Sequence, residues 1–277
     1  MKALKFRKGR ISLQAIANIG LKLFIINSLV ACDKTTPILS NIDNNIQVYG
    51  HGGMGSRSLL SMNSYRSIEK CKELGIKGTE LDIQLTKDSQ LVCYHGLLNN
   101  QVIANYTFNE IQEINKKILS LDTVITSFYH PKNFPFIFDL EIASNENNSA
   151  FKAKFIRALS NLISAHQLNN TIIETNDSSL INDLNLITPK PSIFFLTKEI
   201  DYGFDVIQQY QLDGISTHID QLNSAAVDAF HTSNIYVAAW AVSTKIENNK
   251  ALDIQVDIIQ GDCLKDLKKK TDRINNN

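Results

Sequence analysis

From residue 46 onward, short apolar runs alternate with longer stretches in which apolar residues recur every three or four positions. The short runs predict β-strands over residues 46–50, 78–84, 136–142, 171–175, 192–196, 214–217, 236–242 and 256–260. The helical periodicity predicts helices between them, for example over residues 61–74, 149–168, 204–210 and 220–233. Strands that alternate with helices are typical of a parallel sheet wrapped by helices, and eight such strands fit a closed (β/α)8 TIM barrel.

One connection between the predicted strands is longer than the others. A further strand over residues 91–95 and the stretch 96–134 separate the second barrel strand from the third, whereas connections in compact domains usually span a few residues. We therefore expect a small insertion between strands two and three. A barrel typically takes about 250 residues, so the chain of 277 residues predicts one barrel domain over residues 46–270 that contains the insertion 96–134.

The first 31 residues have the features of a targeting segment. Basic residues crowd the first ten positions, and an apolar run over residues 23–31 follows that is too short to cross a bilayer of about 30 Å. The run ends in Leu29-Val30-Ala31-Cys32, which resembles the bacterial lipobox. We predict a signal peptide over residues 1–31, lipidation of Cys32 and a tether over residues 32–45. An ordinary secretory signal or an interrupted amphipathic helix is the alternative.

Removal of this segment changes the charge balance. Six of the 28 basic residues and none of the 28 acidic residues lie in residues 1–31, so the rest of the chain has about six more acidic than basic residues. A mildly acidic body argues against a nucleic-acid partner. Acyl chains on Cys32 would then attach the protein to a membrane of the bacterial cell envelope, facing the periplasm or the exterior. No protein partner is implied.

Two acidic residues alternate along the second predicted strand. In Gly78-Thr79-Glu80-Leu81-Asp82-Ile83, the side chains of Glu80 and Asp82 face one side and those of Leu81 and Ile83 the other. Two carboxylates held on one face repel each other, and a cation relieves this repulsion. Oxygen ligands favour Mg²⁺ or Ca²⁺ over zinc. The pair therefore predicts a divalent cation site.

A histidine lies on either side of this strand in the sequence. His51 occurs in Tyr49-Gly50-His51-Gly52-Gly53, and His95 ends the run Leu91-Val92-Cys93-Tyr94-His95. A metal that neutralises a phosphate, together with two imidazoles that transfer protons, is what phosphodiester cleavage requires. Taken singly, His51 is more typical of a hydrogen-bonded turn, and Glu80 or Asp82 of a solvated strand. The order in which they occur favours the functional interpretation.

These residues resemble the glycerophosphodiester phosphodiesterase family in order and spacing. The family motif combines a strand that ends in His-Arg-Gly or His-Gly-Gly, then Glu-Asn-Thr, then Glu-x-Asp before a Thr-Lys-Asp turn, then a strand that ends in His. Later similarities lie at residues 106–111, 136–142, 239–242 and 256–259, so the resemblance spans about residues 46–264. Because barrel enzymes place their chemistry at the carboxyl ends of the strands, the positions of the motif residues agree with the predicted fold.

The resemblance implies a role for each matched residue. Glu80, Asp82 and Glu141 would be ligands of the divalent cation, His51 and His95 would be the acid and base, and Trp240 would contact the alcohol portion of the substrate. The inserted segment would cap the site. A glycerophosphodiester would be cleaved to a phosphomonoester and an alcohol, with the attacking oxygen supplied by water or by a neighbouring hydroxyl of the substrate. We prefer His51 as the base. Core packing is the alternative role of Trp240.

The chain also departs from the family pattern at four positions. Gly52 replaces the arginine that often follows the first histidine, Met62 the glutamate of Glu-Asn-Thr, Gly96 an aspartate, and Ala143 a lysine. Two cationic phosphate contacts are therefore missing. Lys198 and His218, which follow the predicted fifth and sixth strands, are candidate replacements for binding the substrate. Solvated loop residues are the alternative.

Two other function classes fit parts of the sequence. A catalytically decayed barrel lipoprotein that binds phosphate-containing ligands agrees with the four departures, and metal affinity without turnover would indicate it. An unrelated barrel hydrolase is permitted by the fold alone. Zinc bound by several histidines would indicate that class, but His130, His166 and His231 lie in predicted loops or helices.

Overall fold

Eight parallel strands close into a barrel in the computed structural model, which describes residues 45–129, 134–143 and 148–275. The strands are β1 (Gln47–His51), β2 (Gly78–Leu85), β5 (Phe136–Leu140), β6 (Thr171–Thr175), β7 (Ser192–Leu196), β8 (Gly214–His218), β9 (Tyr236–Val242) and β10 (Ile258–Gly261). Their order around the barrel is β1-β10-β9-β8-β7-β6-β5-β2, and the pairing of β1 with β2 closes the ring. The predicted (β/α)8 TIM barrel is confirmed. The predicted signal peptide and Cys32 lie outside the described residues.

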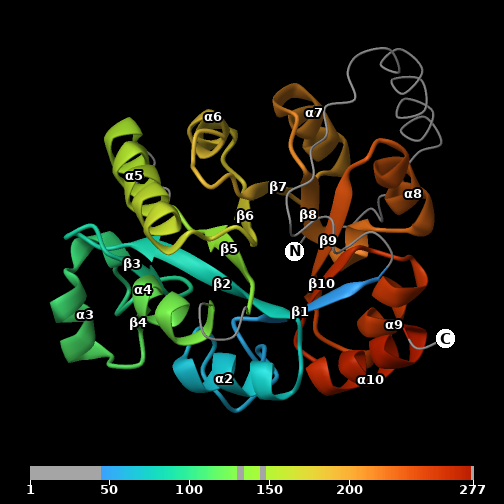
Figure 1. Ribbon diagram of the computed structural model, residues 1–277, viewed down its shortest axis with the longest axis horizontal. Coiled ribbons are helices and arrows are strands. Elements are labelled where there is room, and N and C mark those ends of the chain that lie inside the picture. Colours follow the sequence, from blue (N-terminus) through green and yellow to red (C-terminus); the bar gives the residue numbers. More distant parts are fainter. Residues whose placement is uncertain (1–44, 130–133, 144–147, 276–277) are drawn as a thin grey trace, which may run out of the picture.

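Helices surround the strands in the ribbon view (Figure 1). They are α2 (Tyr65–Glu73), α5 (Ser149–His166), α6 (Ile181–Leu184), α7 (Ile200–Tyr210), α8 (Ser224–Thr232), α9 (Lys245–Asp253) and α10 (Leu264–Asn275). The main apolar core lies between this outer layer and the strands, and it includes Phe155 and Leu159 of α5 and Val227 of α8. None of the helices in the described part of the chain is long and apolar enough to cross a membrane.

The connection between β2 and β5 contains further elements beside the barrel (Figure 1). These are β3 (Leu91–Cys93), a 3-10 turn (Ile103–Asn105), α3 (Phe108–Ile114), β4 (Leu119–Ser120), α4 (Leu121–Val124) and a π-helical turn (Ile125–Tyr129). Strand β3 pairs antiparallel with the end of β2. The segment has a small apolar cluster of its own that includes Ile103 and Ile111. Its first residues therefore lie against the strand that carries the carboxylate pair.

The barrel interior changes from apolar to polar along the strands. One buried cluster inside the barrel contains Tyr49, Ile137, Ile172, Phe194, Ala238 and Ile258. Because side chains of a strand face the same side at every second residue, the next interior positions toward the carboxyl ends are two residues further on. These positions are His51, Asp139, Glu174, Leu196, Trp240 and Gln260. An apolar floor thus supports a polar layer at the carboxyl ends of the strands.

Several element ends differ from the sequence-based expectation. The helix expected over residues 61–74 begins only at Tyr65, because Asn63 has a left-handed φ of 58° and the side chain of Ser64 caps the helix. The helix expected over residues 220–233 is divided into a 3-10 turn (Ile219–Gln221) and α8, which Asn223 caps. Strand β5 ends at Leu140, so Glu141 follows the strand, whereas β1 extends to His51 and β8 to His218.

Candidate active site

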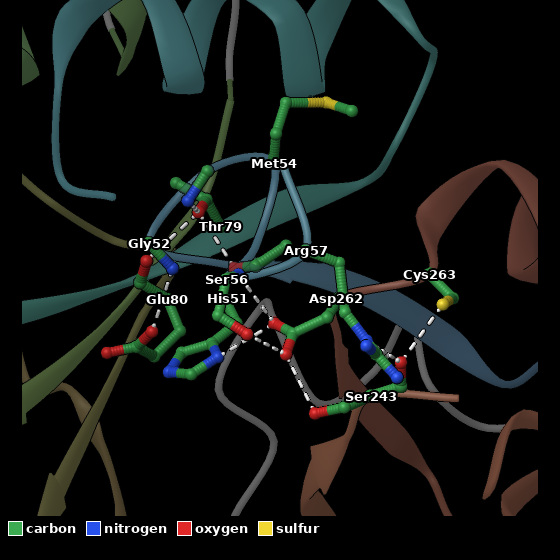
Figure 2. Close-up of polar contacts among 12 residues, drawn as sticks. His51, Gly52, Met54, Ser56, Arg57, Thr79, Glu80, Ser243, Asp262 and Cys263 are labelled. Carbon is green, nitrogen blue, oxygen red and sulfur yellow. Dashed lines mark hydrogen bonds and ion pairs between the residues drawn. The ribbon is translucent and has the colours of Figure 1, made fainter. Parts of the chain in front are cut away.

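His51 is held at the end of β1 by Asp262, which follows β10. The Nδ1 atom of His51 lies 2.9 Å from Oδ1 of Asp262. The carboxylate of Asp262 also accepts the hydroxyl protons of Ser56 at 2.5 Å and of Ser243 at 2.7 Å. Figure 2 shows Asp262 at the junction of these three contacts. Loops that follow β1, β9 and β10 therefore meet at a single carboxylate.

The protonation of this pair follows from its surroundings. Burial alone raises the pKa of Asp262, but the hydrogen bonds from His51, Ser56 and Ser243 outweigh burial and hold that pKa well below its usual range. An ionised carboxylate only accepts hydrogen bonds, so Nδ1 of His51 is the donor. Burial opposes protonation of His51, yet Asp262, together with Asp82 and Glu174, raises the pKa of the imidazole above its ordinary value. The basic Nε2 atom of neutral His51 is therefore left for chemistry.

The turn after His51 brings the backbone onto β2. Gly52 and Gly53 have φ values of 54° and 96°, a region that favours glycine. The Gly52 N–H donates to Oε2 of Glu80 at 3.1 Å (Figure 2). The Gly53 N–H donates to Oγ1 of Thr79 at 2.7 Å. A Cβ atom on Gly52 would lie 2.8 Å from Cβ of Met62. The His-Gly-Gly turn thus positions both His51 and Glu80.

Four acidic side chains crowd the polar layer of the barrel. Glu80, Asp82 and Glu174 are almost fully buried, and Asp139 is partly buried. Burial, followed by the charges of neighbouring carboxylates, raises the pKa of Glu80 and of Asp139 well above the ordinary values. Burial also raises the pKa of Glu174 to about 7, although Gln260 donates to its Oε1 at 2.6 Å. Such a cluster repels itself and is relieved by protons or by a cation.

Two of the predicted metal ligands are oriented by amide side chains. Asn63 donates through Nδ2 to Oδ2 of Asp82 at 2.7 Å and accepts from the Asp82 backbone N–H at 3.2 Å. Glu141 accepts at Oε2 from Nε2 of Gln84 and from the Gly96 N–H, both at 3.0 Å. Hydrogen bonds of this kind fix the direction of a carboxylate before a cation binds.

His95 lies beside Glu141 at the mouth of the barrel. Its Nε2 atom is 3.3 Å from Oε1 of Glu141, and 67% of the His95 side chain is exposed. Burial raises the pKa of Glu141 above its ordinary value. The connection between β2 and β5 thus supplies a solvent-accessible imidazole next to the carboxylates.

The predicted ligands Glu80, Asp82 and Glu141 are divided between two groups. One ligand atom from each of Asp82, His95 and Glu141 lies within 4.8 Å of the others, and the same holds for Glu80, Asp82 and Asp139. Asp82 belongs to both groups. Oxygen donors predominate in each, which is the donor set of Mg²⁺ and Ca²⁺. The mutual repulsion of the buried carboxylates gives a further reason for a divalent cation to bind here. The residues present are therefore suitable ligands for Mg²⁺ or Ca²⁺.

The three residues predicted to contact the substrate lie together. The Nζ atom of Lys198 is 5.2 Å from the centroid of the Trp240 ring, and the ring of His218 packs edge-on against Trp240 at a centroid distance of 4.7 Å. Strand β9 is irregular here, because its register with β10 shifts and Ala241 has a left-handed φ of 59°. Bulges of this kind reorient side chains near functional sites.

Sequence reasoning did not find several residues that complete the site. Asp262, Asn63 and Gln84 form hydrogen bonds with predicted residues, and the charge of Glu174 acts on His51. For Asp262, the signal was its position just past the last strand, where barrel enzymes carry functional residues. Gln84 lies two residues after Asp82 and so faces the same side of β2.

Comparison with known proteins identifies the family of this chain. Residues 51–264 match the glycerophosphoryl diester phosphodiesterase family, which is most of the chain. The chain belongs to this family. A relative, the glycerophosphocholine phosphodiesterase gde1 of Schizosaccharomyces pombe, is 32% identical over 98 residues. That match covers 33% of this chain and 9% of gde1, so the chain spans only a small part of that relative.

Solved structures of the phosphodiesterase family share the barrel. A glycerophosphodiester phosphodiesterase from Parabacteroides distasonis is 21% identical, with a TM-score of 0.73 and coverage of 83% of this chain and 98% of that one. A phosphodiesterase from Oleispira antarctica in complex with the product sn-glycerol-3-phosphate is 16% identical, with a TM-score of 0.72 and coverage of 82% and 96%. At these identities the likeness shows the fold.

Proposed function

We propose that the protein is a phosphodiesterase that uses a divalent cation to hydrolyse glycerophosphodiesters to a phosphomonoester and an alcohol. The observation that carries this proposal is that Asp82 shares one group of possible ligand atoms with Glu141 and His95 and a second group with Glu80 and Asp139, while His51 pairs in register with Glu80. Family membership and the named activity of gde1 support the substrate class. The product found in the Oleispira antarctica enzyme agrees with a phosphomonoester product.

The carboxylates would hold Mg²⁺ or Ca²⁺, with Asp82 shared and with Glu80, Glu141 and Asp139 around it. When bound, the cation neutralises the phosphate charge that grows in the transition state. Asn63, Gln84 and the Gly96 N–H keep the carboxylates in place. Because several of these groups are buried, the protein excludes water that would otherwise weaken the electrostatic attraction.

The two histidines would divide the proton transfers. The Nδ1–H group of His51 donates to Asp262, and the pKa of the imidazole is raised. Its Nε2 atom is therefore a suitable base for the attacking water or for the neighbouring hydroxyl of the glycerol. In the second case, the first product is a cyclic phosphate that water then opens. His95, exposed and beside Glu141, would protonate the departing alcohol.

A product screen tests the proposed reaction. The purified protein is incubated with glycerophosphodiesters in chelator and with added Mg²⁺ or Ca²⁺, and glycerol phosphate and free alcohol are quantified. We expect turnover only with the cation and its loss in Asp82→Asn, while His51→Ala and His95→Ala each lower turnover about 10²-fold or more. Asp228→Asn, on the exposed face of α8, is the control. Full activity in excess chelator would contradict the metal requirement, and metal binding without turnover would favour the decayed lipoprotein.

We also propose that the protein is attached to the bacterial cell envelope through lipid on Cys32, since a basic and then apolar segment leads into the lipobox-like Leu29-Val30-Ala31-Cys32. The decisive measurement is mass spectrometry of the native amino terminus. We expect an acylated Cys32 as the first residue and release or failed processing of Cys32→Ala. An unmodified first residue other than Cys32 would instead indicate ordinary secretion.

A further inference from the structure

The mouth of the barrel is divided into two unlike halves. The carboxylates of the proposed cation site, together with Glu174, lie on or just after strands β2, β5 and β6, whereas the other five strands are consecutive neighbours around the ring, in the order β1-β10-β9-β8-β7. At their carboxyl ends lie His51, Asp262, Trp240, His218 and Lys198. His51 stands at the boundary between the halves, because β1 pairs with both β2 and β10. A diester whose phosphorus is near His51 therefore has the cation-binding half on one side and the Trp240 half on the other.

Lys198 occupies the face of Trp240 where a cationic ligand would bind. Its ammonium lies 5.2 Å from the ring centroid. Within residues 45–129, 134–143 and 148–275, no carboxylate forms an ion pair with Lys198, so its charge is not neutralised by the adjacent Glu199. The backbone on both sides is fixed, because the Thr197 N–H donates to the Ser216 carbonyl and the Glu199 N–H donates to Oγ1 of Thr197. The ammonium is thus delivered by a short, anchored turn.

Aromatic faces recognise quaternary ammonium groups by cation–π attraction. A choline group that approached Trp240 here would have to displace Lys198 and would then lie beside a second positive charge. An alcohol that carries a negative charge would instead be attracted to Lys198 and could accept hydrogen bonds from its ammonium. Lys198 on Trp240 therefore disfavours binding of a quaternary ammonium alcohol and favours binding of an anionic one.

We propose that Lys198, seated on Trp240, selects glycerophosphodiesters whose alcohol is anionic and disfavours those whose alcohol is a quaternary ammonium. The inference rests on the proposed function, since it concerns the alcohol side of the same site. It distinguishes this chain from a glycerophosphocholine phosphodiesterase such as gde1. Lys198 acts on the choice of substrate, and the cleavage chemistry stays with the carboxylates and histidines.

Three diesters that differ in the charge of the alcohol test the proposal. Glycerophosphoglycolate, glycerophosphoglycerol and glycerophosphocholine carry an anionic, a neutral and a cationic alcohol. For the purified protein, kcat/KM should fall in that order. In Lys198→Met, the ratio between the anionic and the cationic diester should shrink by about two- to fivefold, the strength of one exposed cation–π contact. Lys198→Glu should move the ratio further in the same direction.

Lys245→Met is the matched control, because Lys245 is also an exposed lysine just past a barrel strand, at the start of α9. We expect it to leave the order and the ratios unchanged. An equal fall in kcat/KM for all three diesters in Lys198→Met would mean that Lys198 contacts the phosphate, and it would overturn the selectivity proposal. An unchanged ratio would also overturn it.

Binding supplies a readout that does not need turnover. Trp240 is the only tryptophan in the sequence, so its fluorescence reports ligands at this position. The three diesters titrated against this emission should show the same order of affinity, and Lys198→Met should compress that order. If the protein turned over none of the diesters, the proposed function would be contradicted. The order of affinities would still decide the role assigned to Lys198.

Discussion

Asp262 controls the imidazole that we assign as the base. It lies 211 positions after His51 in the chain, and its carboxylate combines the contact to Nδ1 with two serine hydroxyls. The serines hold Asp262 in place and keep it ionised. The charge of Asp262 favours the protonated imidazole, so this one residue sets both the tautomer and the proton affinity of His51.

Asp262→Asn should shift the pH profile of the reaction. The variant loses the charge that raises the pKa of His51 and weakens the hydrogen bond to Nδ1, whereas the opposing effect of burial remains, so that pKa falls. A base works above its pKa, and the acidic limb of kcat against pH should therefore move to lower pH. The maximum rate should drop about tenfold or more, because the imidazole is no longer held in one tautomer.

Asp257→Asn gives the comparison for this measurement. Asp257 pairs with His231 at the same distance of 2.9 Å, but the pair joins α8 to the start of β10, away from the catalytic mouth. Its removal should leave the acidic limb where it is. If Asp262→Asn and the wild type had identical profiles, His51 would not be the group that titrates in the reaction.

At the scale of elements, helix α9 connects local stability to the site. Its N-cap is Thr244, whose side chain accepts from the Glu247 N–H, while the Glu247 carboxylate accepts from the Thr244 and Ser243 N–H groups. The same Ser243 donates its hydroxyl to Asp262. The beginning of a peripheral helix thus fixes a residue that supports His51.

Thr244→Ala should lower both stability and turnover. Loss of an N-cap costs about 1 kcal/mol of unfolding free energy, or roughly 2–4 °C in Tm for a domain of this size. Because Ser243 loses part of its support, turnover should also fall. Thr107→Ala removes the equivalent capping box of α3, in the segment between β2 and β5, and should cost similar stability without changing Asp262. Equal losses of turnover in both variants would contradict the proposed connection.

The whole barrel brings like charges together at one end. Eight strands that converge on a single mouth place Glu80, Asp82, Asp139 and Glu174 in one layer. Burial, together with the charges of neighbouring carboxylates, raises the pKa values of Glu80, Asp139 and Glu174 there. The apolar floor beneath them, with Tyr49 and Phe194, offers no counter-charge. The fold therefore depends on protons or a cation at this layer to reduce the repulsion.

Divalent cations should accordingly raise the thermal stability of the protein. At a hundredfold excess over Kd, a ligand of the native state adds about 2.7 kcal/mol, which corresponds to roughly 5–10 °C in Tm. Melting is followed in chelator and in rising Mg²⁺ or Ca²⁺, for the wild type and for Asp82→Asn. The increase should be largely lost in the variant. An equal increase in both proteins would place the cation somewhere other than at Asp82.

When no cation is bound, the buried carboxylates also determine how the stability of the protein depends on pH. The folded-state pKa of Glu174, about 7, exceeds the ordinary value for glutamate, so the unfolded state releases this proton at lower pH than the folded state does. In chelator, Glu174 therefore favours folding below its unfolded pKa, and this contribution is lost as the pH rises toward 7. The cation should oppose that loss.

The sequence by itself determined the barrel and the carboxylate pair on β2, because these follow from local periodicity, and the order of its motifs predicted the two flanking histidines. A strand alternates its side chains, and Glu80 and Asp82 share a face wherever the strand lies. Only the tertiary structure decided which distant residues complete the site. Closure of the ring sets Asp262 beside His51, places Lys198 over Trp240 and joins Gln260 to Glu174 across 86 positions. The pKa values likewise follow from burial and from neighbouring charge, which exist only once the strands have converged.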